Sequence, residues 1–320
     1  MGIFSKVLQV SSLFFISGRI LSLKDNSVKW LVHQPPNALN NGTLVKMHNA
    51  SFVEKCEFIR TLNRQAKRFL SIDFESLYAI ENYFWSVGNG VTLELGALDG
   101  SNANAEAPSQ TADFVDFGWS RVIIDANPHF RNRMKRFSRD AFSVNAAICR
   151  PNMEHDVHFV YQSGPKSPSA GIVEFMSPSF IAEFYPYLAS NLTRGLENLP
   201  QGVEATKVSC LPLQKILDHA LVQHINFFVL DVEGAEFEIL QSISWTHVRF
   251  DVLCIETSPE KKSHRQEGFA QIVTRYLKIR GYEHIFDDRR NSWFKHTSFI
   301  PFKRPYCCPI PNTVHHPYVQ

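Results

Sequence analysis

The stretch Val91–Ser101, VTLELGALDGS, constrains the fold of this chain more than any other. Its apolar residues predict a short buried strand that leads through Glu94 into a turn bracketed by Gly96 and Gly100, and a helix is expected over Gln110–Phe117. Glycine permits a sharp turn and lets a ligand approach the backbone closely. A helix start leaves unpaired N–H groups beside that turn. A strand, a glycine turn and a helix in this order are typical of the first unit of a nucleotide-type α/β fold.

The glycine spacing restricts the class of ligand. G-x-x-x-G differs from the G-x-G-x-x-G of pyrophosphate sites, which disfavours a nicotinamide dehydrogenase. The carboxylate of Glu94 would repel a phosphate and suits a zwitterionic or cationic ligand such as S-adenosylmethionine. Taken alone, the stretch is equally compatible with an ordinary glycine turn after a buried strand.

Apolar runs and amphipathic segments alternate through the rest of the chain and predict a doubly wound, mostly parallel α/β sheet with an antiparallel terminal strand. Ile225–Leu230 is almost continuously apolar, as expected for a strand covered on both faces. The expected strands are Val91–Leu95, Arg121–Asp125, Phe142–Cys149, Val157–Val160, Val208–Leu211, Ile225–Leu230, Asp251–Ile255, Tyr282–Phe286 and Phe294–Ile300. The expected helices are His129–Phe137, Pro178–Asn191, Leu213–Ala220 and Gln266–Arg280. Gln162–Asn191 forms an insertion, which either covers the active site or is ornamental.

The N-terminal residues are typical of a targeting segment. Val7–Gly18 is an apolar run of about a dozen residues, which fits a secretory signal better than a membrane span of about 20 residues. If Arg19 is tolerated, Val7–Leu23 could instead serve as a short uncleaved membrane anchor. N-x-S/T sequons stand at Asn41, Asn49 and Asn191. The sequence therefore predicts localisation in the secretory pathway, as a secreted, luminal or single-pass anchored protein.

Composition and segmentation add further bounds. A formal net charge of +2 gives no nucleic-acid footprint, so no nucleic-acid partner is expected. The 6 cysteines are compatible with an oxidising compartment, no C-x-x-C pair suggests zinc, and the disulfide pairing stays open. The expected segments are a signal peptide or anchor at 1–23, a stem at 24–51, an N-terminal helical extension at 52–90, the main α/β domain at 91–302 and a tail at 303–320.

Carboxylates and amides gather where the predicted strands end, and ligands of open α/β sheets bind beside the carboxyl ends of the strands. Asp125 can accept hydrogen bonds from both hydroxyls of a ribose. Asp231 opens the densest acidic stretch, D-V-E-G-A-E, whose carboxylates need a positive group or hydrogen-bond donors beside them. Asp231 and Glu256 could share a divalent metal ion, but no spacing requires one, and no metal is predicted. The set comprises Glu94, Asp99, Asp125, Asn127, Asn145, Asp231, Glu233, Glu236 and Glu256. Singly, such residues can instead cap helices or form turns.

Several boxes together resemble a known family. VTLELGALDG, GWSRVIIDANP, NAAIC, FFVLDVEGAEFEIL and VLCIE, in this order and at these intervals, are similar to the FkbM-type family of S-adenosylmethionine-dependent methyltransferases. The resemblance runs from Val91 to Phe299, and the D-V-E-G-A-E box is its most specific part. It implies a Rossmann-like class I methyltransferase fold and O-methylation of a hydroxyl, often on a sugar or natural product. The same boxes also resemble Star-like membrane proteins of animals, which handle secretory cargo.

The resemblance implies roles for the strand-end residues. It implies cofactor contacts from Glu94, Gly96 and Asp99 at the methionine end, from Asp125 at the ribose, and from Asn145 and Ala146 at the adenine. Gly100 and Asn127 are two further expected cofactor-binding residues. Asp231 and Glu233 would face the transferred methyl group and the acceptor. Asp231 is the expected base or acceptor-positioning residue, and His284 is a second candidate base. Many relatives carry Glu in place of Asp125, so the shorter Asp has to reach further. The insertion matches no motif, which leaves acceptor selection open.

Two hypotheses of different classes follow. The leading one is a luminal S-adenosylmethionine-dependent O-methyltransferase that acts on a small-molecule or glycan acceptor. The alternative is a non-catalytic, membrane-tethered adaptor that keeps the fold and binds a protein cargo. The intact set of Glu94, Gly96, Asp99, Asp125 and Asp231 favours the enzyme, since an adaptor has no need of it. Binding of S-adenosylmethionine would separate the two.

Overall fold

The structure is a computed structural model that describes residues 75–85, 87–101, 109–137, 141–152, 155–162, 170–188, 196–257, 268–288 and 290–303. The expected signal segment 1–23, the stem 24–51 and residues 52–74 of the expected helical extension lie outside the described residues. So do the sequons at Asn41, Asn49 and Asn191 and the tail beyond residue 303. Within the described ranges, no helix is long and apolar enough to cross a membrane.

The main sheet has seven strands in the order β10-β11-β9-β8-β1-β2-β3. The neighbours from β9 to β3 all pair in parallel, whereas β11 pairs antiparallel with both β9 and β10. The strands are β1 (Val91–Leu95), β2 (Ser120–Asp125), β3 (Ala141–Asn145), β8 (His224–Leu230), β9 (Arg249–Glu256), β10 (Tyr282–Asp287) and β11 (Asn291–His296). The predicted α/β fold with a mostly parallel central sheet is confirmed. Because β2 and β8 lie on opposite sides of β1, the strand order reverses at β1, and ligands bind at such switch points.

Both faces of the main sheet are covered, as the continuous apolar run of β8 predicts. Phe227 and Phe228 are successive residues of β8, point to opposite faces, and are both fully buried. On the Phe227 side, α3 (Glu75–Asn82) and η2 (Ala112–Phe117) pack their aromatic and aliphatic side chains against the sheet. On the other side, Phe228 stacks on Phe250, which contacts Trp245. The remaining helices are η3 (Pro128–Phe130), α4 (Arg131–Phe137), η4 (Val173–Phe175), α5 (Pro178–Phe184), η5 (Pro186–Leu188), α7 (Leu213–Ala220), α8 (Glu236–Ser242) and α9 (Phe269–Lys278).

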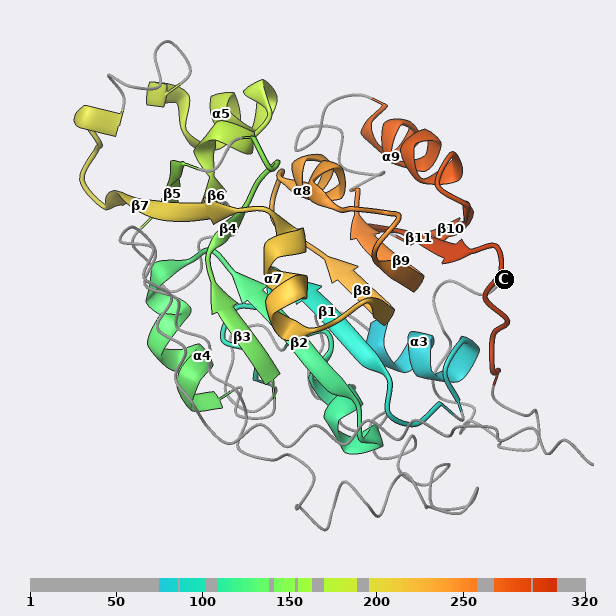
Figure 1. Ribbon diagram of the computed structural model, residues 1–320. Coiled ribbons are helices and arrows are strands. Elements are labelled where there is room, and N and C mark those ends of the chain that lie inside the picture. The colour runs from blue at the N-terminus through green and yellow to red at the C-terminus, as the bar shows by residue number, and fades with distance from the viewer. Residues whose placement is uncertain are drawn as a thin grey trace, which may run out of the picture. The chain divides into compact units, whose positions relative to one another are not determined.

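A second sheet of four strands, in the order β4-β7-β5-β6, accounts for several segments that the sequence did not separate from the main sheet. Its strands are β4 (Ala147–Ile148), β5 (Asp156–Gln162), β6 (Gly171–Ile172) and β7 (Val203–Leu211). The expected strand Phe142–Cys149 is divided into β3 and β4, with Ala146 between them, because the chain leaves one sheet and enters the other. Figure 1 shows the second sheet and α5 at one end of the main sheet.

Two predicted helices are shorter than their sequence patterns suggested. The segment expected as helix Gln110–Phe117 is a 3₁₀-helix, Ala112–Phe117, closed by Gly118 in a left-handed conformation. The helix expected over Pro178–Asn191 ends at Phe184, since Pro186 disfavours helical geometry at Tyr185. Its start is capped by the Ser177 side chain, which accepts a hydrogen bond from the backbone N–H of Phe180.

Candidate functional site

The glycine turn after β1 brings two strand ends together. Gly96 has φ +85°, and a Cβ at this position would lie 1.7 Å from the carbonyl oxygen of Asp231. The Asp231 N–H donates to the carbonyl oxygen of Leu95, at 3.1 Å. Only glycine fits here, because a side chain would push the end of β1 away from the end of β8. Gly96 therefore lies at the centre of the switch point, and its predicted cofactor contact stays a prediction.

Glu94 is buried in β1 and satisfied by protein donors. Its carboxylate accepts hydrogen bonds from the Ser109 hydroxyl at 2.6 Å, from the Gln110 N–H at 2.7 Å and from the Thr111 N–H at 3.2 Å. It also lies 3.5 Å from a guanidinium nitrogen of Arg121. In these contacts Glu94 holds the segment that follows the glycine turn. These contacts do not favour a direct contact between Glu94 and a cofactor.

Arg121 is a structural residue of the site that the sequence did not reveal. It lies in β2, is 5% exposed, and donates to the hydroxyls of Thr111 and Ser109 at 3.1 and 2.6 Å. A third bond reaches the carbonyl oxygen of Gly100, at 3.1 Å. Arg121 therefore connects both ends of the loop after β1. Gly100 is thereby placed in the turn as predicted, with its backbone engaged by the protein.

The Asp99 carboxylate forms hydrogen bonds inside the same turn. Its carboxylate accepts bonds from the backbone N–H and the hydroxyl of Ser101, at 3.0 and 2.8 Å. The second oxygen binds Arg133 of α4 at 2.7 Å. Asp99 is 1% exposed, whereas the Arg133 side chain is 43% exposed. This pair links the turn after β1 to the helix after β2.

Asp125 ends β2 and faces the turn from the neighbouring strand. One carboxylate oxygen accepts from the Leu98 N–H and the other from the Asn127 N–H, each at 2.7 Å. Burial raises the pKa of Asp125 to about 7, although both backbone bonds oppose the rise. Leu98 itself has φ +53°, which is unusual for a residue with a side chain. The strand-end carboxylate is thus oriented by the two loops that border the predicted ribose site.

The residues predicted beside the ribose and adenine hold the ends of β2 and β3 together. The Asn145 side chain donates to the carbonyl oxygens of Asp125 and Asn127, both at 2.8 Å. The Ala146 N–H donates to the carbonyl oxygen of Asp125, at 3.1 Å. Asn127 also caps η3 by accepting from the His129 N–H. These residues therefore lie together next to Asp125, as the sequence predicted, and each has a structural contact.

A second carboxylate cluster lies at the ends of β8 and β9. Asp231 accepts hydrogen bonds from the Gln110 side chain at 3.1 Å and from Arg290 at 2.9 Å. Arg290 also binds Glu256, at 3.0 Å. Burial and the charge of Glu256 raise the pKa of Asp231 well above its usual value, against the opposing effect of Arg290. Gln110 connects this cluster to Glu94, whose carboxylate accepts its backbone N–H.

Glu233 completes the cluster. Carboxylate oxygens of Asp231, Glu233 and Glu256 lie within 4.8 Å of one another, which is close enough for one metal ion. Glu233 has φ +55°, and Gly234 follows at φ +119°. Strained backbone of this kind is common at functional sites. The sequence anticipated Asp231, Glu233 and Glu256, but not the Arg290 contact.

The second sheet borders this acidic turn. A Cβ on Gly171 of β6 would lie 3.1 Å from Cε of Met176 and 3.5 Å from the carbonyl oxygen of Glu233. A Cβ on Gly234 would likewise lie 3.5 Å from the Cα of Met176. The insertion that the sequence left open between two readings therefore packs against the turn after β8. This contact places the insertion beside Glu233 and Gly234.

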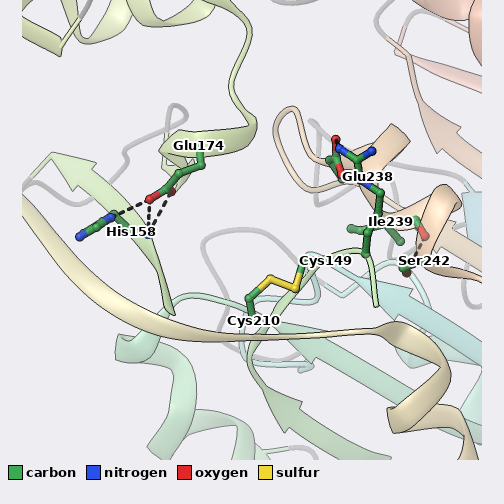
Figure 2. Close-up of a disulfide and its surroundings, with 8 residues drawn as sticks. Cys149, His158, Glu174, Cys210, Glu238, Ile239 and Ser242 are labelled. Carbon is green, nitrogen blue, oxygen red and sulfur yellow. Dashed lines mark hydrogen bonds and ion pairs between the residues drawn. A yellow bond between two sulfur atoms is a disulfide. The ribbon is translucent and has the colours of Figure 1, made fainter. Parts of the chain in front are cut away.

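A disulfide joins Cys149 and Cys210 and ties the end of β4 to β7 (Figure 2). The sequence left the disulfide pairing open, because the parallel pairing of β4 with β7 that brings these two cysteines together has no local sequence signal. Arg150, the next residue, forms an ion pair with Glu238 of α8 at 2.6 Å. Elsewhere in this sheet, Figure 2 shows His158 of β5 bound to Glu174 of η4, at 2.6 Å. The disulfide therefore joins two strands of the second sheet, and the Arg150–Glu238 pair connects this sheet to α8, the helix that follows the acidic turn.

His284 is set apart from both carboxylate clusters. It lies on β10, the edge strand, and β11 and β9 separate it from β8. Its ring bonds Asp287 of the same strand at 2.8 Å. The structure does not bring His284 to Asp231, and its role as a base stays a prediction without geometric support.

The family model described as "Methyltransferase FkbM domain" matches residues 94–284 of the chain. The matched range begins at Glu94 in β1, ends at His284 in β10, and contains Asp125, Asp231 and the whole second sheet. A comparison with curated proteins found no match.

Proposed function

The chain belongs to the methyltransferase FkbM domain family, as its sequence motifs predicted. On this premise we propose that it is an S-adenosylmethionine-dependent methyltransferase with a Rossmann-like class I fold, and that it methylates a hydroxyl of a neutral sugar or small molecule. The observation that carries the proposal is the meeting of Gly96 and Asp231 at the switch point of the sheet. This contact places the predicted cofactor turn directly beside an acidic residue suited to bind an acceptor.

The residues around β1 and β2 fit the proposed cofactor. Asp125, oriented by backbone donors, is the residue that would hold the ribose hydroxyls. The Oε1 atom of Gln110 is buried and has no hydrogen-bond partner in the described part of the chain. This acceptor atom, on the loop between the two clusters, suits the ammonium group at the methionine end. When bound, S-adenosylmethionine supplies a methyl group attached to a positively charged sulfur.

Asp231 is the residue that we assign to the acceptor. Methyl transfer to a hydroxyl requires that the oxygen be aligned and that its proton be removed. The carboxylate of Asp231 can accept that proton, and its environment makes it a stronger base than an ordinary aspartate, because burial and Glu256 raise its pKa. Gln110 and Arg290 bind Asp231 from two different loops and fix its orientation. Glu233 lies within reach of the same acceptor position.

The charge of the site favours a neutral acceptor. Asp231, Glu233 and Glu256 converge at the strand ends, and one guanidinium faces them. An acidic acceptor such as a uronic acid or a phosphorylated sugar would meet carboxylates of its own sign, which costs binding energy. A hydroxyl of a neutral glycan or small molecule avoids this cost.

We also propose that the protein works in an oxidising compartment such as the lumen of the secretory pathway. Disulfides persist in oxidising environments, and Cys149 and Cys210 form one. The apolar run Val7–Gly18 and the sequons agree with this placement. In cells, a glycosidase that removes N-linked glycans should increase the electrophoretic mobility of the protein. An unglycosylated protein found in the cytosol would contradict the placement.

A transfer assay tests the enzymatic proposal. The chain is incubated with S-adenosylmethionine labelled in the methyl group and with panels of neutral and anionic glycans and small alcohols, and the products are read by mass spectrometry. We expect label on a neutral acceptor, a loss of at least about a hundredfold in rate for Asp231→Asn, and a rate near wild type for His284→Gln. Equal rates for wild type and Asp231→Asn would remove Asp231 from the mechanism.

A further inference from the structure

Arg290 lies in the turn between β10 and β11, beyond residue 284, where the family match ends. Its backbone is fixed on both sides of the turn. Its N–H donates to the Asp288 side chain at 2.9 Å, and its carbonyl oxygen accepts from the Thr257 N–H at 2.9 Å. Pairing of Asn291 with Glu256 in the antiparallel register then places Arg290 beside the end of β9. The side chain therefore starts from a defined position at the site.

From this position the guanidinium bridges two carboxylates. Its Nε binds Glu256 Oε1 at 3.0 Å, and its Nη2 binds Asp231 Oδ2 at 2.9 Å. The side chains of Glu256 and Asp231 are 6% and 15% exposed, whereas that of Arg290 is 32% exposed. The positive charge thus closes the outer side of a largely buried acidic pair.

Carboxylates this close repel one another unless a cation lies between them. A divalent metal ion is one such cation, and an arginine that stays protonated at any physiological pH is another. We propose that Arg290 is the resident cation of this site: it holds Asp231 and Glu256 side by side in the place of a divalent metal, and so makes the site metal-independent. Arg290 is a positioning residue, since it acts through Asp231. The inference rests on the proposed function only in taking this cluster as the acceptor site.

The test is a titration of the full-length chain with Mn²⁺, followed by calorimetry and by the electron paramagnetic resonance signal of the free ion. We expect Arg290→Gln to bind Mn²⁺ at least about tenfold more tightly than wild type, because the carboxylates lose their cation. Adding Asp231→Asn to that variant should remove the gain. Arg290→Lys keeps the charge and should behave like wild type.

Arg249→Gln is the matched control. Arg249 also pairs with a buried carboxylate, Asp251, at 3.3 Å, but in the described ranges Asp251 belongs to no group of three metal-binding side chains. This variant should show no gain in Mn²⁺ affinity. A gain equal to that of Arg290→Gln would mean that the effect is nonspecific and would overturn the proposal.

Two further results would overturn it: no gain in the folded Arg290→Gln variant, or a wild-type chain that already binds Mn²⁺ tightly and loses it with Asp231→Asn. If Arg290→Gln does not fold, Mn²⁺ binding is compared between the wild type and Asp231→Asn. Tight binding by the wild type that is lost in Asp231→Asn overturns the proposal, and the absence of tight binding by the wild type supports it. Mn²⁺ binding is independent of methyl transfer. A chain that binds S-adenosylmethionine but fails the Mn²⁺ test refutes only the role of Arg290, and the opposite pair of results refutes only the proposed function.

Discussion

Glu94 and Asp231 are carboxylates on neighbouring strands of the same sheet, and they are held in different ways. Glu94 is 2% exposed and binds donors from Ser109, Gln110 and Thr111, with Arg121 buried beside it. In the described residues, the Asp231 carboxylate accepts from the side chains of Gln110 and Arg290, and it has two acidic neighbours. The Glu94 carboxylate is bonded mainly to the loop that follows β1, whereas the Asp231 carboxylate lies among charged side chains.

This difference indicates that the two carboxylates, at the same edge of the sheet, have different roles. A carboxylate whose oxygens are satisfied by buried donors stabilises the fold and cannot exchange its partners cheaply. A carboxylate that has a raised pKa and lies next to a partly exposed arginine can accept a proton, or a hydrogen bond from a substrate hydroxyl. We therefore expect substitutions around Glu94, on the proposed cofactor side, to lower mainly the stability of the fold. Substitutions around Asp231, on the proposed acceptor side, should lower mainly the activity.

The largest effect is expected at Gly96, where the two sides meet. Gly96→Ala should lower the free energy of unfolding by more than about 4 kcal/mol, because its Cβ collides with the backbone of Asp231. Gly281→Ala is the matched control, since Gly281 has φ +86° but its Cβ would meet ordinary contact, 3.4 Å from the His296 ring. The control should lose only about 1–2 kcal/mol. Equal losses in urea denaturation would contradict the close approach of β1 and β8.

The next test compares the two carboxylates directly. Glu94→Gln should cost about 3–5 kcal/mol of stability, because it removes the negative charge that lies beside the buried guanidinium of Arg121. Asp231→Asn should change stability by less than about 1 kcal/mol, since a neutral side chain relieves the repulsion from Glu256. Chemical denaturation of both variants checks the ranking. A larger loss of stability for Asp231→Asn than for Glu94→Gln would contradict the roles given to the two carboxylates.

The disulfide tests how firmly the second sheet is held. Replacing Cys149 and Cys210 by serine opens a loop with a sequence separation of 61 residues. We expect a loss of about 2–4 kcal/mol in the free energy of unfolding. A reducing agent should cause a similar loss in the wild type and none in the double variant. A reductant effect that persists in the double variant would assign the stabilisation to another pair.

The pH dependence of Asp125 gives the smallest single step, about 1.4 kcal/mol per pH unit, and the sharpest signature. Its pKa of about 7 means that protonation removes an acceptor for the ribose, so the affinity for S-adenosylmethionine should fall up to about tenfold per pH unit below 7. The stability of the ligand-free chain should change in the opposite sense. Because the folded state holds this proton more tightly than the unfolded state, stability falls as the pH rises from about 4 to about 7. Asp125→Asn should remove both slopes.

Much of the main sheet could be predicted because its strands are continuous apolar runs. Ile225–Leu230 and Asp251–Ile255 fall within β8 and β9. The second sheet was missed because β5 and β7 are joined by antiparallel pairing that only the tertiary structure defines. The break at Ala146 between β3 and β4 was missed because the chain changes its pairing partner there, from β2 to β7, and this change is also defined only by the tertiary structure.

The site shows the same division. Asp125 and Asp231 could be identified because each follows an apolar strand in an open α/β sheet. Arg121 and Arg290 could not, because one arginine in a strand or a turn carries no local signal. Arg290 meets Asp231 across 59 residues of sequence. His284 was chosen for its chemistry alone, and its position on the edge strand gives it no neighbour among the carboxylates of the site.

The most direct test of the account is a calorimetric titration of the chain with S-adenosylmethionine at pH 8, where Asp125 is ionised. We predict micromolar binding by the wild type, loss of that binding in Asp125→Ala, and unchanged binding in His284→Gln. A folded wild-type chain that does not bind S-adenosylmethionine, or an Asp125→Ala variant that binds it equally well, would contradict the assignment of this strand edge as a cofactor site.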